Sequence, residues 1–492
     1  MFEAADVEHR CSKADWRLEE PVLREQLLAL QVALGQQKRR AVLVIVGGVD
    51  GAGKSEVVHQ LNEWMDPRYI HTHGFGEPSD EERERPPMWR YWRMLPPKGV
   101  IGIYYGSWYS APIVSRVLGD AAEAELDQQL AVISRHEEML AAEGVLILKF
   151  WMHLSKVQQR DRLKALERDP ETRWRVSRED WRRFKRYDEF RKVCTRALRG
   201  SSSVHAPWLV VPGLCKRYRA LAVGRALLDA MQKALVPTPL EAIEPEPVAV
   251  VHAERVLAQV IQGRRLAKRD YESQLEHWQG ELALLARHPR FRKRSLIAVF
   301  EGWDAAGKGS AIRRVTAALD ARHYQIVPVA APTEEARAQP YLWRFWRQLP
   351  RRGQFVIFDR SWYGRVLVER VEHYCRPSDW QRAYAEINDF EAQLATGGSI
   401  LAKFWLQISP EEQLRRFEER QQIAYKRFKI TEEDWRNRAR RADYEAAVGD
   451  MVVRCSTEYA PWSLIDAEDK RWARIRVLQT LVERLQAGLH GS

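Results

Sequence analysis

The chain has 492 residues, of which 45% are hydrophobic and 30% charged, and its formal net charge is +12. This composition excludes an intrinsically disordered chain, and the length is sufficient for two or three domains. No apolar run approaches the roughly 18 residues of a membrane span, and the N-terminus is acidic without an apolar segment, so we expect neither a membrane protein nor a secreted one. The five cysteines form no CxxC pair, which favours free thiols in a reducing cytoplasm. The basic balance predicts a polyanionic partner.

The predicted elements occur in two series along the chain. Each series has a helical pattern, an apolar strand and then two further apolar strands. The helices are expected at 19–34 and 269–286, and the strands at 41–46, 99–105, 144–151, 295–300, 354–359 and 399–405. Short apolar strands that alternate with helices predict an α/β fold with a doubly wound parallel sheet.

The two series are copies of one module. GVDGAGKS at 48–55 recurs as GWDAAGKG at 302–309, and WRYWRMLP at 89–96 recurs as WRFWRQLP at 343–350. SWY, KFW and APW also recur, and the partners of every pair lie 254 residues apart. Five matches in order at one offset indicate a tandem duplication.

A connector lies between the two copies. VPTPLEAIEPEPV, at 236–248, contains four prolines and several glutamates. This composition favours an extended, semi-rigid segment. We therefore predict a first domain at 1–235, a linker at 236–249 and a second domain at 250–492.

A glycine-rich loop follows the first strand of each copy and precedes a helix. In that context the backbone N–H groups and the helix N-terminus point at a phosphate. The usual ATP-binding loop ends in a hydroxyl that holds Mg²⁺, whereas the second copy has Gly309 at that place. Lys308 is predicted to hold the transferred phosphoryl group. Asp304, inside the loop, is either a turn-stabilising residue or a metal ligand that compensates for Gly309.

The end of the next strand distinguishes the two copies. Asp359 stands where a P-loop enzyme holds its Mg²⁺, and Arg360 and Arg365 follow it. The first copy has Tyr105, Gly106 and Ala111 at the three equivalent positions. We therefore expect the second copy to be catalytic and the first to be degenerate.

A basic segment between two later helical patterns predicts a mobile lid over the phosphates, with a solvated helix face as the alternative. In the second copy its cations are Arg420, Lys426, Arg427 and Lys429. The first copy retains lid arginines at 168, 173 and 175. Together with Lys54 and Lys149, these arginines favour a first copy that extends a basic track for the polyanion. The alternative is a first copy that buries the face through which a single module would pair.

With these residues identified, the chain resembles the polyphosphate kinase 2 family. The segments that carry the resemblance are EGWDAAGKGSAIRR (301–314), PTEEARAQPYLWRFWRQLP (332–350), FDRSWYGRVLVER (358–370), KRFKITEEDW (426–435) and STEYAPWSLIDAEDKRWAR (456–474). The family's loop ordinarily ends in GKG, which accounts for Gly309. The resemblance implies a P-loop kinase-like core with a helical lid, duplicated in tandem. It also implies transfer of a phosphoryl group between inorganic polyphosphate and a nucleotide, with Mg²⁺.

The resemblance further implies an acceptor and a set of partners. Tandem members of the family make ADP from AMP, whereas single-module members more often act on nucleoside diphosphates, so AMP is the expected acceptor. A polyphosphate-dependent nucleoside diphosphate kinase, an ATP-dependent monophosphate kinase and a polyanion or nucleic-acid binder without activity are the alternatives. We expect polyphosphate and AMP or ADP as partners, without nucleic acid or membrane, and the sequence leaves a homo-oligomer open.

Site residues follow from the same resemblance. Asp304 and Asp359 would bind the metal and the acceptor phosphate, and Lys308 and Arg360 would act at the reacting centre. Two departures from the family bear on the acceptor rather than on the reaction. Gly364 stands where many members have Asn, and Ile423-Ala424 replaces the Asp169-Pro170 step that the first copy retains. The expected phosphate-binding residues are Gly302, Ala305, Ala306, Gly307, Gly309, Ser310, Arg365, Arg420, Lys426, Arg427, Lys429 and Lys470.

Overall fold

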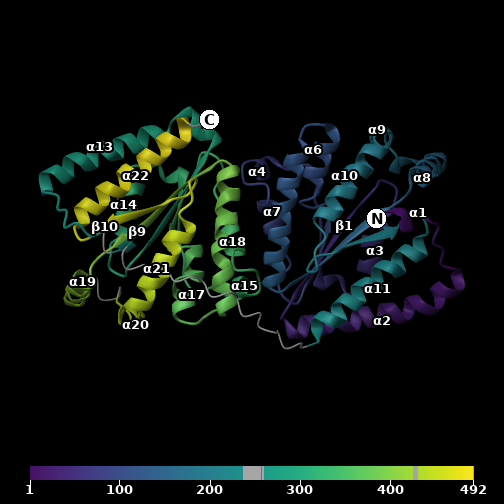
Figure 1. The fold of residues 1–492 in the computed structure, drawn as a ribbon, viewed down its shortest axis with the longest axis horizontal. Coiled ribbons are helices and arrows are strands. Elements are labelled where there is room, and N and C mark those ends of the chain that lie inside the picture. The colour runs from purple at the N-terminus through teal and green to yellow at the C-terminus, as the bar shows by residue number, and fades with distance from the viewer. Residues whose placement is uncertain (237–255, 258–259, 425–429, 491–492) are drawn as a thin grey trace. The chain divides into compact units, whose positions relative to one another are not determined.

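The computed structural model describes residues 1–236, 256–257, 260–424 and 430–490 (Figure 1). Its contacts divide the chain into two compact units. Unit 1 comprises Met1–Pro78, Arg90–Pro239 and Pro332–Trp343, and unit 2 comprises Ser79–Trp89, Leu240–Ala331 and Arg344–Ser492. The predicted linker at 236–249 lies outside the described residues except for residue 236, so the predicted domain limits stay predictions.

Each unit contains a parallel five-stranded sheet, and the two sheets have the same topology. Their strand orders are β2-β3-β1-β4-β5 and, for unit 2, β7-β8-β6-β9-β10. The strands are β1 (Ala41–Gly48), β2 (Ile70–Gly74), β3 (Ile101–Tyr105), β4 (Val145–His153), β5 (Trp208–Pro212), β6 (Ser295–Gly302), β7 (Tyr324–Pro328), β8 (Phe355–Asp359), β9 (Ser399–Gln407) and β10 (Trp462–Asp466). The central β1 and β6 are almost entirely buried because strands flank them on both sides. This arrangement confirms the predicted doubly wound, duplicated α/β fold.

Helices cover both faces of each sheet. In unit 2, α13, α14 and α22 pack together on one face, and α17, α18 and α21 pack together on the other (Figure 1). The main helices of the first repeat are α2 (Lys13–Gln37), α3 (Lys54–Trp64), α6 (Ser110–Leu118), α7 (Glu123–Ala142), α8 (Lys156–Arg168), α9 (Arg178–Lys185), α10 (Tyr187–Gly200) and α11 (Lys216–Leu235). Those of the second are α13 (Lys268–Ala286), α14 (Lys308–Thr316), α17 (Val368–Val371), α18 (Pro377–Thr396), α19 (Pro410–Gln422), α20 (Glu432–Ala439), α21 (Arg441–Cys455) and α22 (Lys470–His490).

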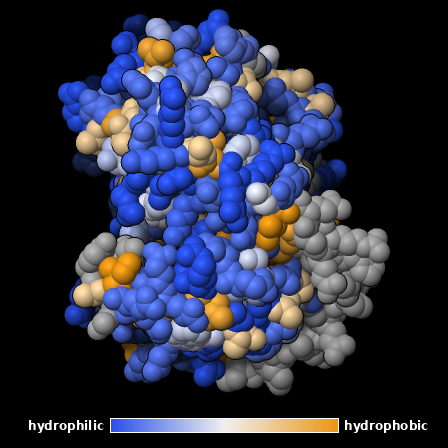
Figure 2. Space-filling model, turned by 90° about the vertical axis from the view of Figure 1, so that its left-hand side faces the viewer, coloured by the Kyte–Doolittle hydropathy of each residue, from blue (hydrophilic) through white to orange (hydrophobic). Residues whose placement is uncertain are grey.

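The surface agrees with the polar composition of the chain. Hydrophilic residues dominate the face drawn in Figure 2, and hydrophobic residues are scattered over it in small groups. Scattered apolar residues of this kind are normal on a protein surface. Within the described residues, no helix is long and apolar enough to cross a membrane.

A buried ion pair joins the sheet to its helices in unit 2. Lys403 Nζ on β9 donates to Glu391 Oε2 on α18 at 2.6 Å and to the carbonyl of Cys455 on α21 at 2.7 Å. Its third bond goes to the hydroxyl of Tyr363, which lies 2.7 Å away, just after β8. Burial lowers the pKa of Lys403 and raises the pKa of Glu391, and the opposite charge of the partner counteracts each shift. A fully buried pair is tolerated only when its remaining polar atoms are also satisfied, as they are here.

The same network recurs in unit 1. Lys149 Nζ donates to Glu137 Oε2 at 2.6 Å and to the carbonyl of Ser201 at 2.7 Å. The Lys149 side chain has no solvent exposure. The prediction that Lys149 belongs to a basic surface track is therefore wrong, because its charge is enclosed in the core of the unit.

We expect the Lys403→Met substitution to destabilise the chain by about 3–5 kcal/mol, because it leaves Glu391 buried without a counter-charge. The midpoint of urea unfolding, followed by circular dichroism, measures the loss. The Lys403→Met/Glu391→Gln double variant should recover much of it, since glutamine is neutral and still accepts from Trp362 and Tyr363. An unchanged midpoint in the single variant would contradict this account.

Candidate active site

The glycine loop of unit 2 connects β6 to α14. Gly302 ends the strand with φ +141°, and a Cβ on it would lie 2.6 Å from the carbonyl oxygen of Leu406 on β9. Only glycine therefore fits at this close approach between two strands. Gly307, also at positive φ, precedes the first turn of α14. The loop backbone thus leads directly into a helix N-terminus, which is the geometry that binds phosphate.

Lys308 lies in the first turn of α14 and folds back over the loop. Its Nζ donates to the carbonyls of Gly302 at 2.6 Å and Trp303 at 3.2 Å. Burial lowers the pKa of Lys308, and the charges of Asp304, Asp359 and Glu301 oppose this shift. The structure therefore brings the predicted lysine and both predicted aspartates into one electrostatic cluster.

Asp304 is held from two sides. Arg360, the residue directly after β8, donates from NH2 to Asp304 Oδ1 at 3.0 Å, and Asn437 on α20 donates to Oδ2 at 3.1 Å. Burial alone would raise the pKa of Asp304, but the positive charges of Lys308 and Arg360 and the two hydrogen bonds outweigh it. The pKa therefore lies below its usual value.

Two further carboxyl groups lie at the strand ends. Asp359 ends β8, and its side chain has no hydrogen bond or ion pair with any described residue. Glu301 on β6 is buried and accepts from Ser361 Oγ at 2.8 Å. Burial raises the pKa of Glu301 despite this hydrogen bond and the nearby charges of Lys308 and Arg360. Of these two carboxylates, Asp359 can therefore bind a new partner without losing a hydrogen bond or ion pair to a described residue.

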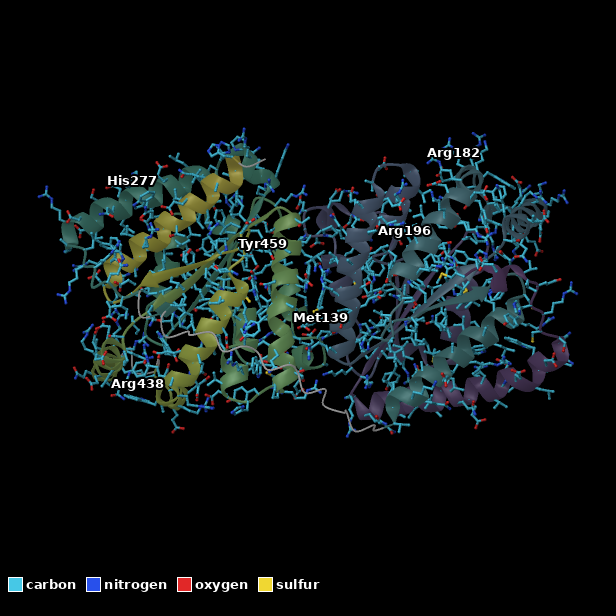
Figure 3. The ribbon with its side chains drawn as sticks, viewed as in Figure 1. Met139, Arg182, Arg196, His277, Arg438 and Tyr459 are labelled. Carbon is cyan, nitrogen blue, oxygen red and sulfur yellow. The ribbon has the colours of Figure 1, made fainter. Side chains whose placement is uncertain are left out.

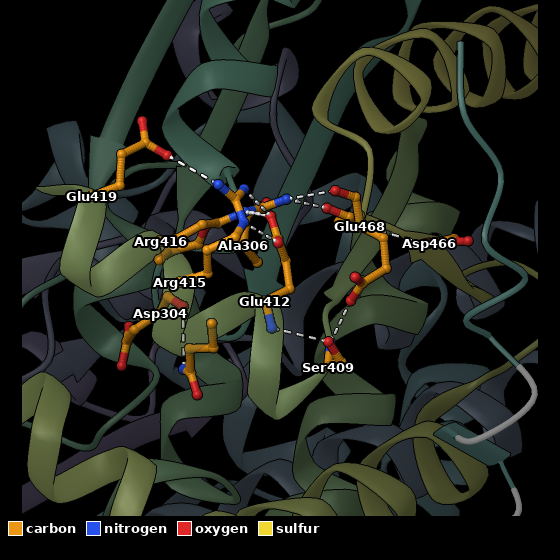
Figure 4. Close-up of polar contacts among 12 residues, drawn as sticks. Asp304, Ala306, Ser409, Glu412, Arg415, Arg416, Glu419, Asp466 and Glu468 are labelled. Carbon is orange, nitrogen blue, oxygen red and sulfur yellow. Dashed lines mark hydrogen bonds and ion pairs between the residues drawn. The ribbon is translucent and has the colours of Figure 1, made fainter.

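A buried arginine holds the loop from behind. Arg416 on α19 donates from NH1 to the carbonyls of Ala305 and Ala306, both at 3.0 Å (Figure 4). Its NH2 group donates to the carbonyls of Ala467 at 2.7 Å and Glu468 at 2.8 Å. Arg416 therefore ties the loop to the segment between β10 and α22, and it turns the loop's carbonyls away from the phosphate side.

The other predicted phosphate ligands differ in the contacts that they make. Ser310 Oγ on α14 donates to the carbonyl of Gly307 at 2.9 Å, and no atom would obstruct a Cβ on Gly309. Arg365 forms an ion pair with Glu369 at 3.1 Å. Lys470, at the start of α22, has Arg416 and Glu419 among its charged neighbours. Arg420 lies in the last turn of α19, and Lys426, Arg427 and Lys429 fall outside the described residues.

Unit 1 keeps the loop but not the charges around it. Lys54 Nζ donates to the carbonyl of Gly48 at 2.8 Å, as Lys308 does to that of Gly302, and also to Asp50 Oδ1 at 3.2 Å. Glu56 takes the place of Ser310 and forms an ion pair with the buried Arg219. That guanidinium lies where a Cβ on Gly53 would be. The charged groups of this loop are therefore paired with one another.

Comparison with known proteins places this architecture in a family. The family model described as Polyphosphate kinase 2 (PPK2) matches residues 10–239 and again residues 265–490. The chain belongs to the polyphosphate kinase 2 family. It is 54% identical over 99% of both chains to a protein of Pseudomonas aeruginosa named polyphosphate:AMP phosphotransferase. A protein of the same name from Acinetobacter johnsonii is 36% identical over 96% of this chain and 97% of its own.

A solved structure supports the assignment over the whole chain. It is described as a putative polyphosphate kinase 2 from Pseudomonas aeruginosa PA01. It is 52% identical, covers 99% of each chain and superposes with a TM-score of 0.91. The suspected resemblance to the polyphosphate kinase 2 family is therefore confirmed for both repeats.

Three residues that line or hold the loop of unit 2 were not predicted from the sequence. Glu301 stands opposite Gly47 in the first copy, so the comparison that singled out Asp359 could also have found it. Arg416 recurs as Arg162, but Arg162 contacts Glu56 at 3.5 Å, so the recurrence does not reveal the loop contacts. Asn437 gives no sequence signal, because its role depends on how α20 folds against the loop.

We expect the Asn437→Asp substitution to move the acid limb of the pH–activity profile upward by about one unit. The wild-type Asp304 pKa is depressed, so Asp304 stays ionised to a lower pH than an ordinary aspartate. A second carboxylate in place of the amide donor raises that pKa, so activity that needs the ionised form is lost at a higher pH. The measurement is kcat/KM for nucleotide phosphorylation against pH.

The first repeat offers a matched control for this experiment. Arg183 occupies the position equivalent to Asn437 and lies 3.5 Å from Asp50. The Arg183→Asp variant should keep the wild-type pH profile, since unit 1 lacks the equivalents of Asp359 and Arg360. An equal shift in both variants would show that the effect does not come from Asp304.

Proposed function

We propose that this chain is a polyphosphate:AMP phosphotransferase, whose catalytic centre is the Asp304–Lys308–Asp359–Arg360 cluster of unit 2. The enzyme transfers the terminal phosphoryl group of inorganic polyphosphate to AMP and forms ADP in a reversible reaction. One observation supports AMP as the acceptor: relatives named polyphosphate:AMP phosphotransferase match both repeats along nearly their full length. The geometry of unit 2 supports the placement of the site.

The residues present fit a magnesium ion. Within the part of the chain that the structure describes, no three metal-binding side chains gather into a site. Mg²⁺, however, is usually held by one or two carboxylates, substrate phosphates and water, so it needs no cage made by the protein. Two carboxylates would hold it: Asp304, which is ionised, and Asp359, whose side chain has no hydrogen bond or ion pair with the described residues. Bound there, Mg²⁺ would neutralise charge on the phosphoryl oxygens.

The chain's own residues supply alignment and positive charge. The loop N–H groups and the N-terminus of α14 bind phosphate oxygens, while Lys308 exchanges its carbonyl partners for the phosphoryl group. Arg360, with 44% of its side chain exposed, reaches the same point from the end of β8. Phosphoryl transfer needs this positioning more than covalent help from the protein. Arg365, Arg420, Lys426, Arg427, Lys429 and Lys470 are proposed to bind further phosphates of the donor.

We expect the purified chain to form ADP from AMP when only long-chain polyphosphate and Mg²⁺ are added. The Asp359→Asn variant should lose at least a hundredfold in kcat, because removal of a metal carboxylate weakens charge neutralisation in the transition state. Chromatography of the nucleotides measures the products. ATP formed from ADP alone would overturn the choice of acceptor, and a requirement for ATP would exclude polyphosphate as the donor.

We expect paired lysine substitutions to show which repeat is catalytic. Lys308→Met should abolish phosphoryl transfer, whereas Lys54→Met, at the same place in the first loop, should leave kcat within about twofold, because Lys54 already neutralises Asp50. Initial rates with saturating polyphosphate and AMP test both variants. Comparable losses in the two variants would assign catalysis to both repeats.

A further inference from the structure

The lid segment of unit 1, residues 168–186, carries an excess of positive charge. It contains eight lysines and arginines against four aspartates and glutamates. It begins at the end of α8, continues through a short helical turn at Arg173–Arg175 that packs on α8, and includes α9. Figure 3 shows Arg182, a residue of α9, at the surface. This basic segment therefore forms an exposed part of the unit.

Four cations of the segment have no side-chain partner in the described part of the chain. The side chains of Arg168, Arg173, Arg178 and Lys185 are exposed and form no hydrogen bond, ion pair or ring contact with any described residue. Like charges that gather without partners repel one another and destabilise the folded chain. No ion pair with a described residue therefore accounts for the presence of these four charges.

Other residues of the segment attach it to the first loop. Arg183 lies 3.5 Å from Asp50 in the loop, and Arg175 lies 4.0 Å from Glu56 in the first turn of α3. Arg175 also lies over the ring of Trp174, with 5.2 Å between its guanidinium carbon and the ring centroid. The Trp174 indole donates to the carbonyl of Glu171 at 2.9 Å. The unpaired cations are thus presented on a segment that is fixed to the body of the unit.

Catalysis does not explain this charge either. The first repeat lacks the equivalents of Glu301, Asp359 and Arg360, which are Gly47, Tyr105 and Gly106. Its loop lysine pairs with Asp50, and Glu56 pairs with Arg219. In the absence of catalysis at this loop, the unpaired cations of the lid segment are best explained by binding of an anion.

We propose that residues 168–186 of unit 1 form a non-catalytic binding surface for inorganic polyphosphate. This inference rests on the proposed function, which supplies polyphosphate as the donor. A polymer with roughly one negative charge per phosphate is complementary to a row of unpaired arginines and lysines, in the way that a nucleic-acid backbone is. Binding here keeps the donor on the enzyme while its end reacts elsewhere.

The test is equilibrium binding of labelled long-chain polyphosphate to the full chain without nucleotide. The test variant changes Arg168, Arg173, Arg178 and Lys185 to Gln. A charge-matched control changes the exposed Lys13, Arg17, Arg24 and Arg39, in and just after α2, to Gln. Circular dichroism and thermal unfolding establish that both variants are folded.

We expect the test variant to bind polyphosphate at least tenfold more weakly and with a smaller dependence on salt. The slope of log affinity against log salt concentration should fall by about 0.7 for each phosphate contact removed, whereas the control should keep the wild-type slope. Equal affinities and slopes in wild type and test variant overturn the inference. Weakened binding of single-stranded RNA with unchanged binding of polyphosphate also overturns it, in favour of a nucleic-acid surface.

The outcome is separable from that of the proposed function. ADP formation from polyphosphate and AMP, together with unaltered polyphosphate binding in the test variant, rejects only this surface. If wild-type protein neither binds polyphosphate nor uses it as a donor, both proposals fail.

Discussion

The buried Lys403–Glu391 ion pair anchors the chain segment that follows β8 in unit 2. Glu391 accepts from both Trp362 and Tyr363, at 3.0 and 2.7 Å, and so fixes the chain immediately after β8 against α18. Asp359 and Arg360 lie just before these aromatic residues, separated from them by Ser361, so the anchored segment begins close to the proposed site. A buried ion pair is weak evidence for stability, because desolvation offsets its attraction, but it specifies one arrangement of strand and helix. The same pair recurs in unit 1, which lacks the equivalents of Asp359 and Arg360, so we attribute a structural role to it.

The two units adopt the same left-handed backbone at two equivalent positions, but with different residues. Ala305 and Arg360 have φ values of +65° and +63°, in the left-handed region that residues with a Cβ seldom occupy. The equivalent residues of unit 1 are Gly51 and Gly106, and they have the same conformation without the steric penalty. The fold therefore demands left-handed backbone at both places. At 360 the second copy has an arginine in spite of a penalty of about 1 kcal/mol, which is the expected sign of a side chain needed for function.

The sequence predicted the inner part of each sheet better than its edges. The inner strands are continuous apolar runs because they are buried on both faces, and each was placed within about three residues. The outer β2, β5, β7 and β10 were not predicted; two of them, IHTHG and YQIVP, lack an apolar run. Side chains show the same limit. Lys308, Asp304 and Asp359 lie in recognisable motifs, whereas Arg416 and Asn437 act through contacts between segments more than 100 residues apart.

The two loops have the same fold but differ in how their charged groups are paired. In unit 2 the opposite charges around Lys308 come from separate strands and helices, so phosphate and metal can replace one partner at a time. In unit 1 the charges are paired within a small set, in which Lys54 neutralises Asp50 and Glu56 neutralises Arg219. An anion that entered this loop would have to displace Glu56 from the buried Arg219, and removing one partner of a buried pair is strongly unfavourable. The proposed polyanion-binding surface of unit 1, residues 168–186, therefore lies outside the loop, where four exposed cations have no side-chain partner among the described residues.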